Sequence, residues 1–189
     1  GFQVGVSFTP DLDDAGQVVS RFDTLGGAVG TPAGYGDVIE AGVNYEGQWD
    51  EVGVAIAATG QIGDSDNAAR EDLQAWNVGT ALNIMGVSVA GSYGDWDEST
   101  NTSGNSGDYY TLGAAYDFGP FGASVTWLDS SLEVGGVDND FENLSFGADY
   151  MLAPGMTPYA EVSLIDADAG GAGVDNDATV VILGTELAF

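Results

Sequence analysis

The chain has 189 residues, no Cys and no His, and thirty Asp and Glu against two Lys and Arg, which gives a formal net charge of -28. The missing Cys and His exclude disulfides, thiolate metal sites and histidine-based catalysis or metal binding, and so acidic a chain lacks the basic surface that nucleic-acid binding requires. The chain is nevertheless 44% hydrophobic, with four Trp, eight Tyr and eight Phe, which argues against disorder.

Apolar residues recur at every second position in ten separate runs, a pattern typical of β-strands. The runs are 2–9, 39–45, 52–58, 76–84, 87–93, 110–118, 121–127, 143–150, 160–164 and 179–189. Most approach the length of about nine to eleven residues that a tilted strand needs to cross a bilayer, and no apolar run is long enough for a membrane-spanning helix. The sequence therefore predicts an all-β fold, a transmembrane antiparallel up-and-down β-barrel, with residues 1–189 as a single barrel domain.

The connections between these runs alternate between short and long. Short connections are expected at 46–51, 85–86, 119–120 and 152–156, and long ones at 10–36, 62–72, 94–108, 129–141 and 166–178. Short turns on one rim and long loops on the other are a feature of outer-membrane barrels. Most of the acids fall in the long connections, so we expect one strongly anionic rim and one nearly neutral rim.

The two faces of each predicted strand differ in chemistry. One face is apolar, and the other carries Gly, Ala, Ser, Thr, Asn and Gln with occasional acids, which suits a wetted lumen inside a lipid-facing wall. Aromatic residues gather near the strand ends and predict two interfacial girdles. We expect Tyr45, Tyr116, Phe118, Phe121, Tyr150 and Phe189 at the short-turn rim, and Trp76, Tyr93, Tyr110 and Trp127 toward the long-loop rim.

A set of acids falls on the polar face by strand parity and is the candidate pore lining: Glu40, Glu161, Asp117, Asp149 and Glu186. A negative lumen enriches cations and repels anions over roughly 8 Å at physiological salt. The sequence thus predicts a cation-preferring pore. A one-residue slip at a bulge would turn some of these side chains to the other face.

Closely spaced acids in the long connections offer oxygen ligands of the kind that calcium prefers. The candidate calcium ligands are Asp95, Asp97, Glu98, Asp138, Asp140, Asp175 and Asp177. None of these stretches completes a known calcium-binding loop. The alternative is a solvated acidic rim, bridged loosely by divalent cations or suited to high salt. No cofactor is required.

Several segments resemble the Gram-negative general diffusion porins, especially the alphaproteobacterial type. They are residues 1–11, 40–45, 75–79, 91–95, 110–116, 147–150 and 184–189. The resemblance implies a sixteen-stranded, homotrimeric outer-membrane barrel with extracellular long loops. These ten strands would then be its C-terminal part, N-terminally incomplete and lacking the constriction loop. Leu187 and Phe189 resemble the family's assembly signal, which the barrel assembly machinery reads.

The sequence therefore predicts a porin, a water-filled channel for passive diffusion of small hydrophilic solutes and ions, set among outer-membrane lipid and lipopolysaccharide. This chain departs from the family in one respect, because its only basic residues, Arg21 and Arg70, fall in long connections rather than on the barrel wall. An enzyme is disfavoured, because a Ser/His site is impossible within this segment. Two alternatives stay open: a small closed outer-membrane barrel with a structural or adhesive role, and a soluble calcium-binding β domain.

Overall fold

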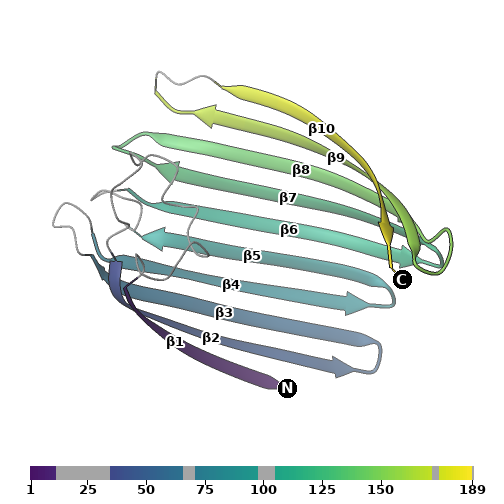
Figure 1. Ribbon diagram of the computed structural model, residues 1–189, viewed down its shortest axis with the longest axis horizontal. Coiled ribbons are helices and arrows are strands. Elements are labelled where there is room, and N and C mark those ends of the chain that lie inside the picture. The colour runs from purple at the N-terminus through teal and green to yellow at the C-terminus, as the bar shows by residue number, and fades with distance from the viewer. Residues whose placement is uncertain (12–34, 66–70, 98–104, 172–174, 189) are drawn as a thin grey trace.

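The computed structural model describes residues 1–11, 35–65, 71–97, 105–171 and 175–188. These residues form one sheet of ten strands in which each strand pairs antiparallel with its neighbours in sequence, in the order β1 to β10 (Figure 1). Each of the ten predicted runs falls on one strand, apart from the end of the last run, where Ala188 follows β10 and Phe189 lies outside the described residues. The all-β, up-and-down prediction is therefore confirmed.

The strands are longer than the predicted runs. Their bounds are β1 (Phe2–Asp11), β2 (Tyr35–Trp49), β3 (Val52–Ser65), β4 (Leu73–Ile84), β5 (Val87–Asp97), β6 (Gly107–Phe118), β7 (Phe121–Glu133), β8 (Asp138–Tyr150), β9 (Met156–Ala169) and β10 (Asn176–Leu187). Ten to fifteen residues per strand equal or exceed what a tilted strand needs to cross a bilayer, so the longer strands extend beyond it.

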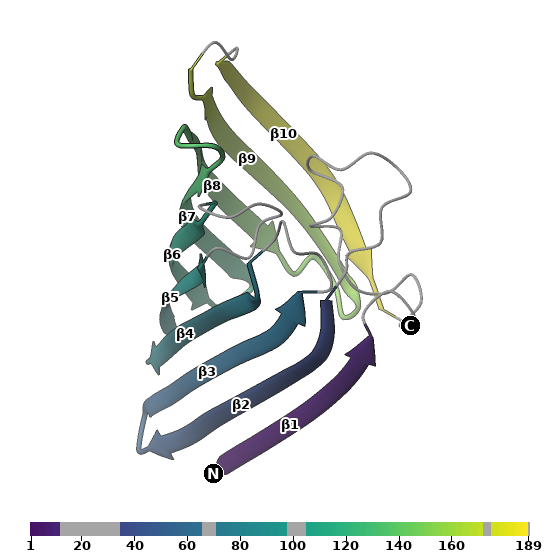
Figure 2. The same cartoon turned by 90° about the vertical axis from the view of Figure 1, so that its left-hand side faces the viewer.

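The sheet curls into an open trough rather than a closed barrel. Figure 2 shows β1 and β10 at the two separated edges of the curved sheet. Neither edge strand pairs with the other, and each keeps one row of backbone donors and acceptors without a strand partner. Unpaired edges do not persist in hydrocarbon, because each unsatisfied backbone group there costs several kcal/mol. No described residues form a helix of the length and hydropathy that a membrane span requires.

The strand ends joined by the turns 50–51, 85–86, 119–120 and 151–155 lie at one end of the sheet, and the other strand ends lie at the opposite end (Figure 1). One of the two-residue turns is Met85–Gly86 between β4 and β5, where both residues have positive φ, 50° and 84°. Two successive positive φ values define the hairpin turn whose twist matches that of paired strands. Glycine is needed at the second position, since a Cβ on Gly86 would lie 3.0 Å from the Asp117 carbonyl oxygen.

One predicted long loop is wrong. Residues 129–141 were expected to connect strands, but β7 continues to Glu133 and β8 starts at Asp138, which leaves a four-residue turn. Val134 and Val137 exchange backbone hydrogen bonds of 2.9 and 3.3 Å across it. The backbone ladder continues after the outward side chains change from apolar to acidic, so the hydrophobic alternation ends before the strand does.

The described residues contain very little conventional core. The buried hydrophobic side chains are Tyr35, Val38, Leu73 and Ala75, at the long-connection end of β2 and β4. A register shift between Gly36 and Ile39 marks the same place. A single curved sheet has no second layer to cover its faces. Its apolar face must therefore be covered by something other than the sheet itself.

Candidate functional site

The strand register sorts the side chains into two continuous faces. Residues paired across the sheet share a face, so Val43 of β2 lies beside Ala58 of β3, which lies beside Val78 of β4. Along this face large hydrophobic side chains remain exposed on every strand, for example Leu112 at 55% and Phe146 at 47%. Soluble proteins rarely expose an apolar patch larger than a few hundred Å², so this face suits lipid.

Aromatic rings border the apolar face at both ends. At the short-turn end the Phe121 ring lies 5.4 Å from Phe118 and 4.6 Å from Tyr150, centroid to centroid. At the other end the Tyr93 ring lies 5.2 Å from Trp76 and 4.6 Å from Tyr110. Both sets occupy the apolar face at the level where membrane barrels carry interfacial girdles. Phe189, expected in the first set, lies outside the described residues.

The opposite face is tied together by hydrogen bonds between neutral polar side chains on neighbouring strands. The pairs are Asn77 to Thr59 (2.7 Å), Asn83 to Ser88 (2.7 Å), Ser92 with Thr111 (2.6 Å) and Ser145 with Ser163 (2.8 Å). Each side chain has further donor or acceptor capacity beyond these bonds. Such a face can be wetted by water, with one exception among the described residues, Asn44 Oδ1, which is buried without a hydrogen-bond partner.

The five acids predicted to line the pore all lie on this polar face. Glu40 pairs with Ser7 and Gln61, and Glu161 pairs with Gly147 and Ile182. Near the short turns, Asp117 and Asp149 both pair with Gly122, and Glu186 pairs with Thr157. The bulge near Gly36 ends before Glu40 and does not invert its parity. The role of the five acids in a pore stays a prediction, because the sheet is open.

The polar face is less uniform than the sequence suggested. Apolar side chains occupy it on β7 to β10, among them Leu128, Phe141, Ile165, Val180 and Ile182. On β10 the apolar residues 180 to 183 stand at consecutive positions, so two of them fall on the polar face whichever face the others take. The small, polar wall is therefore best developed on β1 to β6.

Outward-facing acids continue the apolar face beyond the aromatic residues at the long-connection end. This acidic belt consists of Asp95, Asp108, Asp129, Asp140, Glu142, Asp166, Asp168 and Asp177. Burial, followed by the charges of Asp95, Asp129 and Asp140, raises the pKa of Asp108 above its usual value. A hydrogen bond with Asp175 and then the charge of that carboxylate raise the pKa of Asp168.

The calcium candidates belong to this belt or adjoin it. Asp95 and Asp97 lie at the end of β5, Asp138 and Asp140 at the start of β8, and Asp177 on β10. Asp175 directly precedes β10, and Glu98 lies outside the described residues, as do Arg21 and Arg70. Among the described side chains no three acids come close enough together to hold a metal ion. Calcium binding here stays a prediction.

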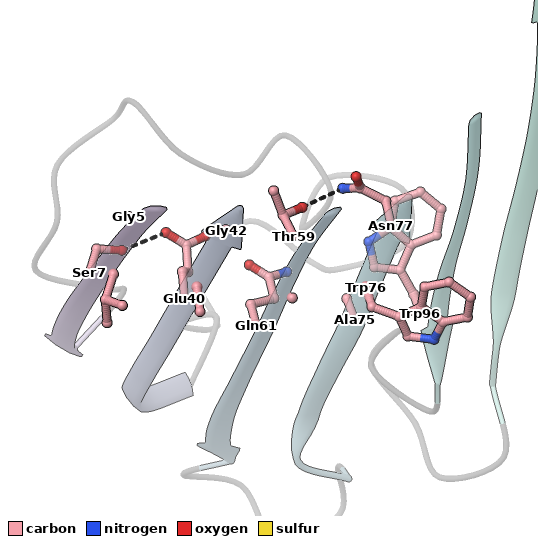
Figure 3. Close-up of a pocket in the computed structure, with 13 residues that line it drawn as sticks. Gly5, Ser7, Glu40, Gly42, Thr59, Gln61, Ala75, Trp76, Asn77 and Trp96 are labelled. Carbon is pink, nitrogen blue, oxygen red and sulfur yellow. Dashed lines mark hydrogen bonds between the residues drawn. The ribbon is translucent and has the colours of Figure 1, made fainter. Parts of the chain in front are cut away.

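A cavity of about 520 Å³ opens on the polar face of β1 to β5 (Figure 3). Its polar lining comes from Ser7, Glu40, Thr59, Gln61 and Asn77, and Trp96 closes one side. The Ser7 hydroxyl donates a hydrogen bond of 3.0 Å to Glu40 Oε2. The sequence prediction included only Glu40 from this group. The signal that could have revealed the rest is Trp96, an indole out of phase with the apolar positions of its strand.

A sheet with one lipid-type face, two aromatic girdles and one wetted face is the wall of a transmembrane β-barrel. Comparison with known proteins agrees, because a profile of the Gram-negative porin family matches residues 1–170. The chain belongs to the Gram-negative porin family, a non-enzymatic channel fold whose location is the outer membrane.

The chain is also similar to uncharacterized proteins of Rickettsia. It is 25% identical to one from Rickettsia bellii (strain RML369-C) over 240 residues and 25% identical to one from Rickettsia felis over 242 residues. A protein from Rickettsia typhi is 24% identical over 243 residues. Each comparison covers 100% of this chain and 54% of the relative. The chain thus spans about half the length of these curated relatives.

Proposed function

We propose that the protein forms a water-filled outer-membrane channel for passive diffusion of small hydrophilic solutes, with a preference for cations. The observation that carries the proposal is the polar face. It presents hydrogen-bonded neutral side chains and the five acids, whereas the described residues contain no Lys or Arg at all. Acids fixed on a low-dielectric wall raise the local concentration of cations and lower that of anions.

The proposed surroundings follow from the other face. The apolar band would contact lipid and the girdles would lie at its two interfaces. The long connections would lie outside the cell, with the acidic belt at the level of the lipopolysaccharide of the outer leaflet. We further propose a homotrimer, closure of the barrel beyond the two free edges, and recognition of Leu187 and Phe189 by the assembly machinery. Leu187 is the last residue of β10 and is 59% exposed.

The test of the channel is recording from the native, full-length protein in a planar bilayer under a salt gradient. Stable ohmic steps with a cation-selective reversal potential are expected. Replacing both Glu40 and Glu161 with Gln should move that potential toward zero, whereas Asp166→Asn on the outward face should leave it almost unchanged. Anion selectivity of the native protein would contradict the role of the wall acids. Well-inserted protein without conductance would contradict the channel itself and favour a closed structural or adhesive barrel.

Calcium at the loop end is a separate proposal. If divalent ions bridge the acidic belt, millimolar calcium should raise the urea midpoint of unfolding of the full-length protein, and a chelator should reverse the shift. Asp140→Asn should reduce the shift, while Asp149→Asn on the polar face should not. Equal effects of calcium and of added sodium at matched ionic strength would show that the belt is a solvated surface whose charges are only screened by salt.

A further inference from the structure

Trp96 differs from the other three Trp residues of the chain in the face that it occupies. Trp49, Trp76 and Trp127 pair with residues of the apolar face, whereas Trp96 pairs with Ala75 and Gly107 on the polar face. Trp at a membrane interface is explained by its amphipathic ring. That explanation does not apply to Trp96, because its indole lies on the wetted side and lines the cavity.

Trp96 belongs to a row of directly paired residues, five of which line the cavity on β1 to β5. The row runs from Ser7 through Glu40, Gln61 and Ala75 to Trp96. Glu40 and Trp96 stand three strands apart, which is roughly 14 Å along the wall at about 4.8 Å per strand. Figure 3 shows the carboxylate at one end of the cavity and the indole at the other, with the small side chain of Ala75 between Gln61 and Trp96.

The hydrogen bonds inside the cavity leave a defined set of groups for a solute. Asn77 Nδ2 donates to Thr59 Oγ1 at 2.7 Å, which leaves the Asn77 carbonyl oxygen as an acceptor. The Ser7 hydroxyl bonds to Glu40 Oε2, which leaves Oε1. Within the described part of the chain the Gln61 amide bonds to no other side chain, and it offers both a donor and an acceptor. Tyr109, 5.2 Å from the indole ring of Trp96, supports that ring from the neighbouring strand.

We propose that this cavity is a binding site for a neutral saccharide of one or two rings, an inference that rests on the proposed channel function. Sugar hydroxyls would donate to Glu40 and accept from Gln61, while the C–H face of a ring would stack on Trp96. A small inorganic cation would engage Glu40 without reaching the indole. A purely apolar solute would desolvate the carboxylate without replacing its hydrogen bonds, which is unfavourable. A volume of about 520 Å³ lies within the usual range for small-molecule sites.

The inference is tested by recording the ionic current of the full-length channel while maltose is added. If the cavity is a binding site, the current should fall to a plateau with a measurable half-saturation concentration. A polyethylene glycol of equal size, which lacks a stacking ring face, should lower the current only in proportion to its concentration. Trp96→Ala should raise the half-saturation concentration of maltose on the order of tenfold, and Trp96→Phe should raise it less. Glu40→Gln should raise the half-saturation concentration by a smaller factor than Trp96→Ala.

Tyr159→Ala is the matched control, because Tyr159 is an aromatic residue on the polar face of β9, outside the cavity. It should leave maltose half-saturation unchanged. A maltose response that never saturates, or that Trp96→Ala leaves unaltered, would contradict the saccharide site. Ohmic conductance in the same recording would still support the channel. Tryptophan fluorescence of the folded protein titrated with maltose reads binding without any current. A saturable change whose half-saturation concentration is unaltered in Trp96→Ala would place the sugar elsewhere and also overturn the inference.

Discussion

Two neighbouring residues in the middle of β7 illustrate the difference between the faces of the sheet. Ser124 pairs with Ala115 and Gly147 on the polar face, and Val125 pairs with Ala114 and Phe146 on the apolar face. The backbone is alike at the two positions, because each residue is paired with a neighbouring strand on both sides. The solvent that each face meets differs, and it decides which side chains are tolerated.

The largest expected difference comes from placing the same charge on each face. Val125→Arg should destabilise the full-length protein in a bilayer by about 2–4 kcal/mol, because the side chain enters hydrocarbon near its midplane. Ser124→Arg should cost under about 1 kcal/mol, since it reaches water. Urea titration of protein folded into vesicles measures both. Equal costs would show that the polar face is not wetted.

A smaller loss is expected at the aromatic girdle. Phe121→Ala removes ring contacts with Phe118 and Tyr150 and should reduce the free energy of unfolding by about 1–2 kcal/mol. Phe121→Leu should recover the part that comes from apolar area alone. The same vesicle titration gives the values. If Leu and Ala were equally costly, the ring arrangement rather than the apolar area would account for the whole effect.

On the polar face, stability should depend on hydrogen bonds between strands. Ser145→Ala and Ser163→Ala should each cost about 0.5–1.5 kcal/mol, because each breaks the 2.8 Å bond between the two hydroxyls. The double variant should cost less than the sum of the single variants. Strict additivity would mean that each hydroxyl bonds mainly to water, and the polar face would then contribute nothing through pairing.

The smallest expected effect is a pH dependence in the acidic belt. The raised pKa of Asp168 means that the folded protein holds its proton more tightly than the unfolded chain does. This group therefore contributes stability that is present below the usual carboxyl pKa of 3.8 and is lost as pH rises through the folded value. Asp168→Asn should flatten that part of the stability profile, whereas Asp177→Asn should leave it. Unfolding midpoints between pH 3.5 and pH 7 provide the comparison, and identical profiles for wild type and Asp168→Asn would contradict it.

The sequence located all ten strands because each one alternates apolar and polar residues where it crosses the membrane. It predicted strands that are too short, since outward positions such as Asp129 and Asp140 are acidic and interrupt the hydrophobic signal inside a strand. It identified Glu40 by parity but not the rest of the cavity. Ser7, Gln61 and Trp96 lie far apart in the chain, and only the register of β1 to β5 brings them into one row.

The sequence by itself determined the class of structure, the two faces and the aromatic girdles. All three follow from local alternation, which is a property of consecutive residues and of the solvent on each side. The tertiary structure alone decided which residues stand side by side, because pairing register depends on turn geometry and on strands that are distant in sequence. The Glu40 to Trp96 row, the outward acidic belt and the apolar side chains on the polar face of β7 to β10 all arise from that register.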